Sequence, residues 1–226
     1  MTQAETKPAR NIEQEDYDKR WAGEAGEKYS GGNQGYTPAM LAFMGKHADK
    51  AAKPATALEV GCGDGYFSSI LAQKGFTVTG IDLSEEGVRV AQRRTPSGTF
   101  LTHDLTRPMP FADGSFDVIW CSEVLEHLFS PLYVLQQMHR VLKPGGVTLL
   151  TVPYHGLLKN LAIAGFAFDK HYDPEYPHLR FFTINTLSGL VRKAGLTVVD
   201  TQTCGSQLGV LRDTLFPTNI LLAARK

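Results

Sequence analysis

The sequence lacks the features that mark several classes of protein. Its 226 residues contain few cysteines, which are widely spaced at Cys62, Cys121 and Cys204, so we expect neither a disulfide framework nor a thiolate zinc site. No apolar run is long enough for a transmembrane helix, and the N-terminus is polar and acidic rather than a signal peptide. We therefore expect a cytoplasmic protein without a membrane span.

A surplus of charge is also missing. The 23 lysines and arginines balance 23 aspartates and glutamates, with a pI near 7.1, and the basic residues are scattered. No nucleic-acid partner is expected, and small or neutral substrates are favoured. The length and the 42% hydrophobic content suit one α/β domain with a small lid or insertion rather than two full domains. Nothing in the sequence indicates the oligomeric state.

What the sequence does contain is a predicted strand that runs into a glycine-rich turn, over residues 57–67. The apolar residues before the turn suit a strand covered on both faces, and those after it recur at helical spacing. Gly61, Gly63 and Gly65 allow positive φ and leave room for a ligand against bare backbone. The stretch is therefore typical of a cradle for a nucleotide-type ligand.

The acidic residues in and beside this turn exclude several classes of nucleotide ligand. Glu59 and Asp64 would repel the pyrophosphate of a dinucleotide, and the G-x-G-x-G spacing differs from the dinucleotide fingerprint. No phosphate-loop lysine follows. The stretch resembles motif I, E-x-G-x-G-x-G, of the class I S-adenosylmethionine-dependent methyltransferases, and the resemblance extends from about residue 17 to the C-terminus. It implies S-adenosylmethionine as the cofactor.

Further acids follow in the order that such a cofactor needs. Asp82 ends the next predicted strand, where an α/β nucleotide fold places a carboxylate on the ribose hydroxyls, while Ser84 is the predicted N-cap of a helix over 84–94. The resemblance implies that Asp104 and the backbone of Leu105 bind adenine. The predicted cofactor residues are Glu59, Gly61, Gly63, Asp82, Leu83, Asp104, Leu105 and Cys121.

Two more landmarks resemble the same family, P-F-x-D-x-S-F-D before the strand beginning at Phe116 and L-K-P-G-G before a strand over 147–152. Together with the alternation of predicted strands and helices, the resemblance implies a doubly wound, Rossmann-like, seven-stranded and mostly parallel sheet with helices on both faces, closed by an antiparallel C-terminal hairpin. Residues 1–52 form a tail and helical lid, in which Trp21 and Tyr29 close over the cofactor. Residues 53–226 form the methyltransferase domain, with an insertion at about 153–183.

The candidate catalytic residues follow the fourth predicted strand directly, at the carboxyl edge of the sheet where α/β ligands bind. If this segment is helical, Glu123, Glu126 and His127 share one face and could bind a divalent cation or orient a proton acceptor. Alternatively they complement a helix dipole. The arrangement resembles that of ubiquinone-pathway O-methyltransferases and small-RNA 2′-O-methyltransferases. This implies Mg²⁺, Mn²⁺ or Zn²⁺ beside the acceptor hydroxyl, with His178 completing the site.

Methyl transfer from a sulfonium requires alignment and a destination for the proton of the nucleophile. His127 and His178 are therefore the predicted catalytic residues, and His155 and His171 are weaker candidates. Because the insertion is aromatic rather than basic, we expect a small apolar or aromatic acceptor that is methylated at a hydroxyl. The alternatives are N- or C-methylation of a small molecule, or a cofactor-binding partner protein without activity. An RNA methyltransferase would need a basic channel.

Overall fold

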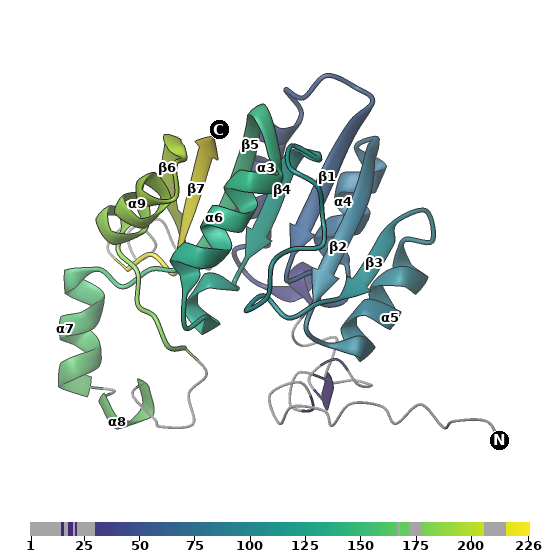
Figure 1. Cartoon of the computed structure of the whole chain (residues 1–226). Coiled ribbons are helices and arrows are strands. Elements are labelled where there is room, and N and C mark those ends of the chain that lie inside the picture. The colour runs from purple at the N-terminus through teal and green to yellow at the C-terminus, as the bar shows by residue number, and fades with distance from the viewer. Residues whose placement is uncertain are drawn as a thin grey trace.

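A computed structural model describes residues 30–166, 168–171, 178–205 and 216–226, together with Glu15, Asp18, Lys19 and Trp21. Within this part of the chain, strands form one sheet in the order β3-β2-β1-β4-β5-β7-β6. Its neighbours pair in parallel except at β7, which is antiparallel to both β5 and β6. The predicted fold is confirmed (Figure 1). The strands are β1 (Ala55–Val60), β2 (Phe76–Asp82), β3 (Thr99–Thr102), β4 (Phe116–Ser122), β5 (Leu142–Pro153), β6 (Thr197–Cys204) and β7 (Asn219–Arg225).

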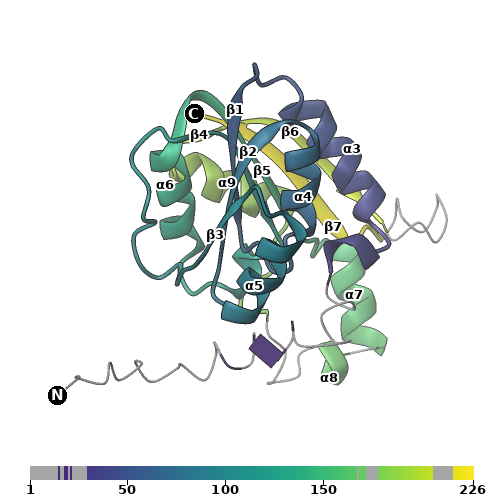
Figure 2. The same ribbon diagram turned by 90° about the vertical axis from the view of Figure 1, so that its right-hand side faces the viewer.

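Helices cover both faces of this sheet. Figure 2 shows α6 and α9 on one side and α3 and α4 on the other. Successive side chains of β4 point to opposite faces, so Val118 and Trp120 pack with α3 and α4, while Ile119 and Cys121 pack with α6 and α9. The helices are η1 (Gly31–Asn33), α3 (Thr37–Ala48), α4 (Tyr66–Gln73), α5 (Glu85–Arg94), η2 (Leu125–His127), α6 (Pro131–Val141), α7 (Leu157–Phe166), α8 (Phe168–His171) and α9 (Ile184–Lys193).

The glycine turn has the backbone that its sequence predicts. The φ angles of Gly61, Gly63 and Gly65 are 73°, 48° and 72°, a region that only glycine enters readily. Gly65 is the N-cap of α4, and a Cβ atom there would lie 2.7 Å from the side chain of Ala91 on α5. Close packing of α5 against the turn therefore adds to the need for glycine.

One predicted boundary is wrong. The strand expected to begin at Val147 begins at Leu142, because Leu142 is already extended and pairs with Phe116 of β4. The predicted stop of the helix is close to the observed one, since α6 ends at Val141. The L-K-P-G-G segment therefore continues as strand instead of forming a separate turn.

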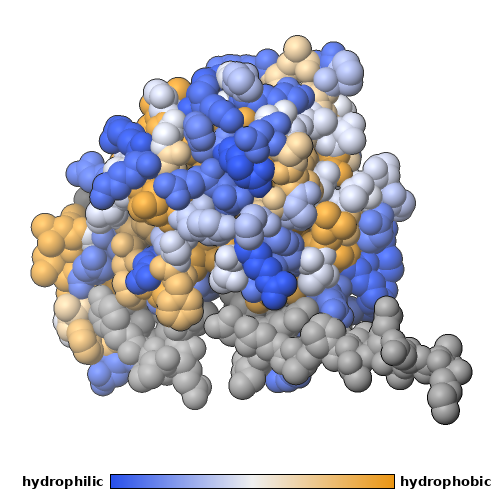
Figure 3. All heavy atoms as spheres, viewed as in Figure 1, coloured by the Kyte–Doolittle hydropathy of each residue, from blue (hydrophilic) through white to orange (hydrophobic). Residues whose placement is uncertain are grey.

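The predicted insertion contains two helices, α7 and α8, which project beyond the sheet at the left of Figure 1. Large apolar side chains on them face solvent, and Figure 3 shows this apolar surface as the orange spheres at the left edge. The most exposed are Leu157 (74%), Leu161 (60%), Phe166 (93%) and Phe168 (57%). None of the described helices has the length and apolar character needed to cross a membrane.

Candidate active site

The carboxylate of Asp82 organises the predicted cofactor side of the site. Its Oδ2 accepts a hydrogen bond from the backbone N–H of Gly63 (2.8 Å), and its Oδ1 accepts one from the N–H of Ser84 (2.9 Å). Burial raises the pKa of this carboxyl group. Asp82 thus links the glycine turn to the start of α5, and with a further backbone hydrogen bond from Leu83 its carboxylate still has acceptor capacity for a ligand hydroxyl.

Glu59 is the most buried of the acids among the predicted cofactor residues. Its side chain is almost fully buried at the end of β1 and accepts a hydrogen bond from the hydroxyl of Ser68 on α4. Burial raises its pKa to about 8. The neighbouring Asp64 is held by Arg94 of α5 at 2.9 Å. Glu59 therefore ties the end of β1 to α4, and Asp64 ties the glycine turn to α5.

The remaining predicted cofactor residues lie on the same edge of the sheet. Asp82 pairs with Thr102 across β2 and β3, which places Asp104 just beyond the end of the neighbouring strand. The Oδ1 atom of Asp104 accepts a hydrogen bond from the N–H of Thr106 (2.8 Å). The side chain of Cys121 is fully buried in the core, so only its backbone can face a ligand. Leu83 is half-buried and Leu105 packs against the core.

Part of the predicted lid lies against the glycine turn. A Cβ atom on Gly63 would come within 2.3 Å of the indole ring of Trp21, so the ring covers this glycine. Tyr29 lies outside the described residues. The nearby Asp18 accepts hydrogen bonds from the hydroxyl of Ser84 (2.6 Å) and the N–H of Glu86 (3.1 Å). Sequence reasoning missed Asp18, because no spacing rule links it to α5.

The predicted helical face of Glu123, Glu126 and His127 is wrong. The φ of Glu123 is 55°, in the left-handed region, and only Leu125–His127 form a single 3₁₀ turn. Such strain in a non-glycine residue is common at functional sites. The carboxylate of Glu123 accepts hydrogen bonds from Thr151 Oγ1 (2.9 Å) and Asn219 Nδ2 (2.7 Å), and burial raises its pKa to about 7. The carboxylate of Glu123 is therefore held by two other strands, and it is not among the candidate ligand atoms that lie close together.

The structure does bring Glu126, His127 and His178 together. One potential ligand atom from each lies within 4.8 Å of the others, and the two imidazole rings meet edge to face with centroids 4.8 Å apart. The insertion returns to this point because the carbonyl of Glu126 accepts hydrogen bonds from the N–H groups of Leu179 (2.8 Å) and Arg180 (3.0 Å). We call these three residues the acid–histidine cluster.

The carboxylate of Glu126 is the least satisfied group of this cluster. Its residue is 1% exposed, and among the described residues neither of its oxygens has a hydrogen-bond partner. The Nε2 atom of His127 lies 3.8 Å away, beyond hydrogen-bond range. Burial and the charge of Glu123 raise the pKa of Glu126 well above its ordinary value. A buried carboxylate in this state is costly unless a proton or a cation joins it.

The weaker histidine candidates lie elsewhere. His155 is buried, and its backbone N–H donates to the carbonyl of Phe182 (2.8 Å). The Nδ1 atom of its ring lies 3.4 Å from the side-chain oxygen of Asn160. Its ring also packs on Phe181. These contacts anchor the start of the insertion and do not bring His155 into the acid–histidine cluster. The side chain of His171 lies outside the described part of the chain.

Sequence reasoning also missed the residues around Glu123. Tyr36, at the start of α3, hydrogen-bonds with the side chain of Asn219, while burial and the charges of Glu123 and Glu126 raise its pKa. Asn219 begins β7 opposite Pro153, at the carboxyl end of β5. The predicted antiparallel hairpin could have placed Asn219 at this edge, whereas nothing in the sequence linked Tyr36 to it.

The chain matches known proteins over most of its length. A family model described as a methyltransferase domain matches residues 35–201. The ubiquinone biosynthesis O-methyltransferase of Burkholderia vietnamiensis (strain G4 / LMG 22486) is 32% identical over 201 residues, which cover 84% of this chain and 85% of that protein.

Solved structures show the same fold at low sequence identity. A methyltransferase in complex with the Haloferax volcanii Trm112 methyltransferase activator has a TM-score of 0.74 at 20% identity, over 93% of this chain and 97% of that one. The Burkholderia thailandensis 1,6-didemethyltoxoflavin-N1-methyltransferase, solved with S-adenosylhomocysteine, has a TM-score of 0.68 at 20% identity, over 94% and 86%. The order of the sequence motifs, the strand order of the sheet and these similarities all indicate the same methyltransferase family.

Proposed function

The chain belongs to the class I S-adenosylmethionine-dependent methyltransferases, and from this premise we propose that it methylates a hydroxyl group of a small apolar or aromatic acceptor. The observation that carries the proposal is the acid–histidine cluster, which lies after β4 at the edge of the sheet that also bears Asp82. A hydroxyl must lose its proton during the transfer. Two imidazoles beside a buried carboxyl group offer a destination for that proton.

We propose that the cofactor lies across the carboxyl ends of β1, β2 and β3. Asp82 would bind the ribose hydroxyls, and Asp104 with the N–H of Leu105 would bind adenine. Gly61 and Gly63 would leave room for the methionine part, and the remaining contacts come from Leu83 and from the backbone of Cys121, with Glu59 beneath the turn. The bound cofactor supplies an activated methyl group on sulfur, so the chain has to align the acceptor and exclude water.

The acid–histidine cluster also fits a divalent cation. One carboxylate and two imidazoles form a donor set that suits Zn²⁺ or Mn²⁺ better than Mg²⁺, which prefers oxygen ligands. The buried carboxylate of Glu126, which has no hydrogen-bond partner among the described residues, supports this fit. Such an ion, when bound, lowers the pKa of a hydroxyl near it. Glu123 was expected as a further ligand, but its carboxylate is engaged with Thr151 and Asn219.

In the mechanism that we propose, one imidazole of the cluster, that of His127 or that of His178, receives the acceptor proton, and Glu126 stabilises the imidazolium that forms. Glu126 also fixes the return of the insertion through its carbonyl. Because Leu179 and Arg180 are bound there, the apolar insertion lies beside the cluster. Two exposed aromatic side chains lie near the cluster in the chain, Phe129 (72%) just before α6 and Phe181 (43%) in the insertion, and they support an apolar or aromatic acceptor.

The relatives support oxygen as the methylated atom. The Burkholderia relative is an enzyme named as an O-methyltransferase, and we propose the same kind of acceptor atom, oxygen, for this chain. The structural neighbour that methylates nitrogen shares the fold at 20% identity and does not favour nitrogen here. A cluster of proton-accepting histidines is needed more for a hydroxyl than for a neutral amine, whose lone pair attacks directly.

The test uses the full chain, methyl-labelled S-adenosylmethionine and matched pairs of small aromatic acceptors that differ only in carrying a hydroxyl or an amine. We expect label in the hydroxyl compounds and a loss of transfer in His127→Gln. The matched control is His155→Gln, which removes a buried histidine outside the cluster. Methylation of the amines alone would contradict the proposal.

A further inference from the structure

A surface cavity lies at the opposite end of the hairpin from the acid–histidine cluster. Its volume is about 300 Å³, and it is lined by Lys46, His47, Lys50, Val199, Asp200 and Arg225. Arg225 pairs with Val147 and Thr197 at one end of β7, whereas Asn219 lies at the other end, beside Glu123. The strand β7 therefore separates this cavity from the proposed methyl-transfer site.

Positive charge predominates in the cavity. Lys46, Lys50 and Arg225 face a single acid, Asp200, so the lining carries a net charge of +2 when His47 is neutral. The whole chain is balanced at 23 basic and 23 acidic residues. The excess is therefore a local feature of this cavity and does not follow from the overall composition.

The one acid of the cavity, Asp200, is already hydrogen-bonded to neighbouring side chains. The Oδ2 atom of Asp200 accepts hydrogen bonds from Lys46 Nζ (2.7 Å), His47 Nε2 (2.8 Å) and Gln202 Nε2 (3.1 Å). These donors lower its pKa to about 2, so it stays ionised at neutral pH and holds Lys46 and His47 in place. Lys50 and Arg225 form no ion pair with any residue that the structure describes.

Helix stability accounts for only part of this charge. Lys46 and His47 lie in the last turn of α3, where cations complement the helix dipole. Lys50 follows the end of the helix, and Arg225 comes from β7. Figure 2 shows α3 beside the β6–β7 edge of the sheet, where these residues meet. One N–H of Arg225 donates to the carbonyl of Gly145 (2.8 Å), which fixes the guanidinium and leaves its other donors available.

We propose that this cavity binds the phosphate group of a small phosphorylated ligand. A fixed guanidinium and two ammonium groups are the donors that proteins use for phosphate. The volume lies at the lower end of the range for ligand pockets. The lining contains no Phe, Tyr or Trp side chain, its one imidazole, that of His47, is held by Asp200, and Val199 is its one apolar member, so recognition is directed at the anion. This site is independent of the proposed methyl transfer.

The test titrates the full chain with inorganic phosphate and with pyrophosphate by calorimetry, at constant ionic strength in chloride. We expect saturable binding that weakens at least tenfold in Lys50→Met and further in Lys50→Met with Arg225→Met. The matched control is Arg192→Met with Lys193→Met, which removes two cations from the last turn of α9. S-adenosylmethionine should bind all of these variants equally well.

A second arm separates a soluble ligand from a lipid headgroup. Vesicles containing phosphatidate are compared with vesicles of phosphatidylcholine alone, and cosedimentation of the protein is measured. Binding of either the free anions or the phosphatidate vesicles that is lost in Lys50→Met and kept in the α9 control supports the site. Absence of both kinds of binding overturns the proposal, as does an equal loss in the α9 control. Because Lys50 is exposed, its single variant keeps the test valid even if the Arg225 change unfolds the protein.

Discussion

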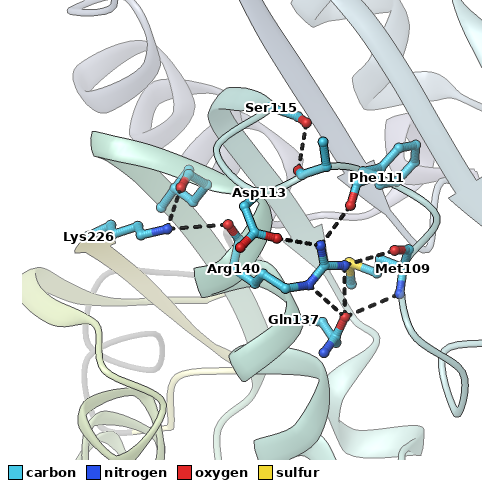
Figure 4. A network of polar contacts seen from close by, with 9 residues as sticks. Met109, Phe111, Asp113, Ser115, Gln137, Arg140 and Lys226 are labelled. Carbon is cyan, nitrogen blue, oxygen red and sulfur yellow. Dashed lines mark hydrogen bonds and ion pairs between the residues drawn. The ribbon is translucent and has the colours of Figure 1, made fainter.

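Two polar regions of this molecule differ in how far their hydrogen-bonding groups are satisfied. Around Arg140 on α6, the guanidinium donates to the carbonyls of Met109 (2.8 Å) and Phe111 (2.7 Å) and to Asp113 (2.9 Å). Figure 4 shows these bonds together with that of Lys226, whose ammonium donates to the carbonyl of Arg140 (3.2 Å). The side-chain oxygen of Gln137 accepts the remaining guanidinium hydrogen bonds (3.0 and 3.2 Å), so every N–H of the guanidinium has an acceptor, and the loop before β4 is held against α6.

The acid–histidine cluster is the opposite case. The carboxylate of Glu126 is as buried as the core, yet neither oxygen has a hydrogen-bond partner among the described residues. Beside it, Glu123 has a left-handed backbone. A satisfied network stabilises the fold and has little capacity left for a ligand, whereas a buried unsatisfied acid destabilises the fold and keeps its capacity to bind. This difference supports our proposal that the acid–histidine cluster, and not the Arg140 network, acts on the substrate.

Among the changes that would test this difference, removal of divalent metal should have the largest effect on the rate of methyl transfer. Protein treated with a chelator is expected to lose at least about 100-fold in methyl transfer, because the proposed ion would lie on the unsatisfied Glu126. Added Mn²⁺ or Zn²⁺ should restore the rate, and calorimetry should show unchanged binding of S-adenosylmethionine. Full activity after chelation would mean that the histidines act without a metal.

The next largest effect is expected on cofactor affinity, when Asp82 is replaced. Asp82→Ala should weaken the binding of S-adenosylmethionine by about 1.5–3 kcal/mol, the range for a hydrogen bond to a charged group. Calorimetry measures the affinity. Asp113→Ala is the matched control, since Asp113 is a carboxylate that contacts Arg140 far from the glycine turn. Equal affinities of the Asp82 variant and the parent would exclude the ribose role.

The satisfied network should respond in stability and not in activity. Arg140→Met should lower the free energy of unfolding by about 1.5–2 kcal/mol, because carbonyls of the loop lose a charged donor. Asp113→Asn should cost less than about 1 kcal/mol, since Asp113 is largely exposed. Urea unfolding checks both values, and methyl transfer by the folded variants should match the parent. A loss of transfer in folded Arg140→Met would place this network in the site.

Glu59 is intermediate between the Arg140 network and the acid–histidine cluster, because its buried carboxyl group accepts a side-chain hydrogen bond from one residue, Ser68. Its pKa in the folded protein, about 8, exceeds its ordinary value of 4.5, so the folded state binds this proton more tightly than the unfolded state. Its contribution to stability is therefore present below pH 4.5 and falls as the pH rises to about 8. Glu59→Gln, which still accepts from Ser68, should show a shallower loss of stability over this window. Identical pH profiles of unfolding would contradict the assignment.

The sequence allowed the sheet and the glycine turn to be predicted because both depend on local patterns. Apolar runs marked the strands, and the three glycines marked positions of positive φ that the structure confirms. The antiparallel hairpin was implied by the resemblance to the methyltransferase family, onto which two predicted strands near the C-terminus were matched. The strands and the glycine turn are encoded within a few residues of where they occur.

The site was less predictable because contacts between distant segments decide it. The left-handed turn at Glu123 accompanies hydrogen bonds that Thr151 and Asn219, on two other strands, donate to the carboxylate of Glu123. His178 reaches His127 only because the carbonyl of Glu126 binds the backbone that follows His178. No periodicity in the sequence reports such a return of the chain.

The most direct test of the central claim, that the unsatisfied cluster performs the chemistry, is the single-turnover rate of methyl transfer from bound S-adenosylmethionine in His127→Gln. The cluster account predicts a rate reduced by about 10²–10⁴-fold, with cofactor affinity and unfolding free energy unchanged, while folded Arg140→Met and His155→Gln keep the parental rate. A parental rate in His127→Gln would contradict the account.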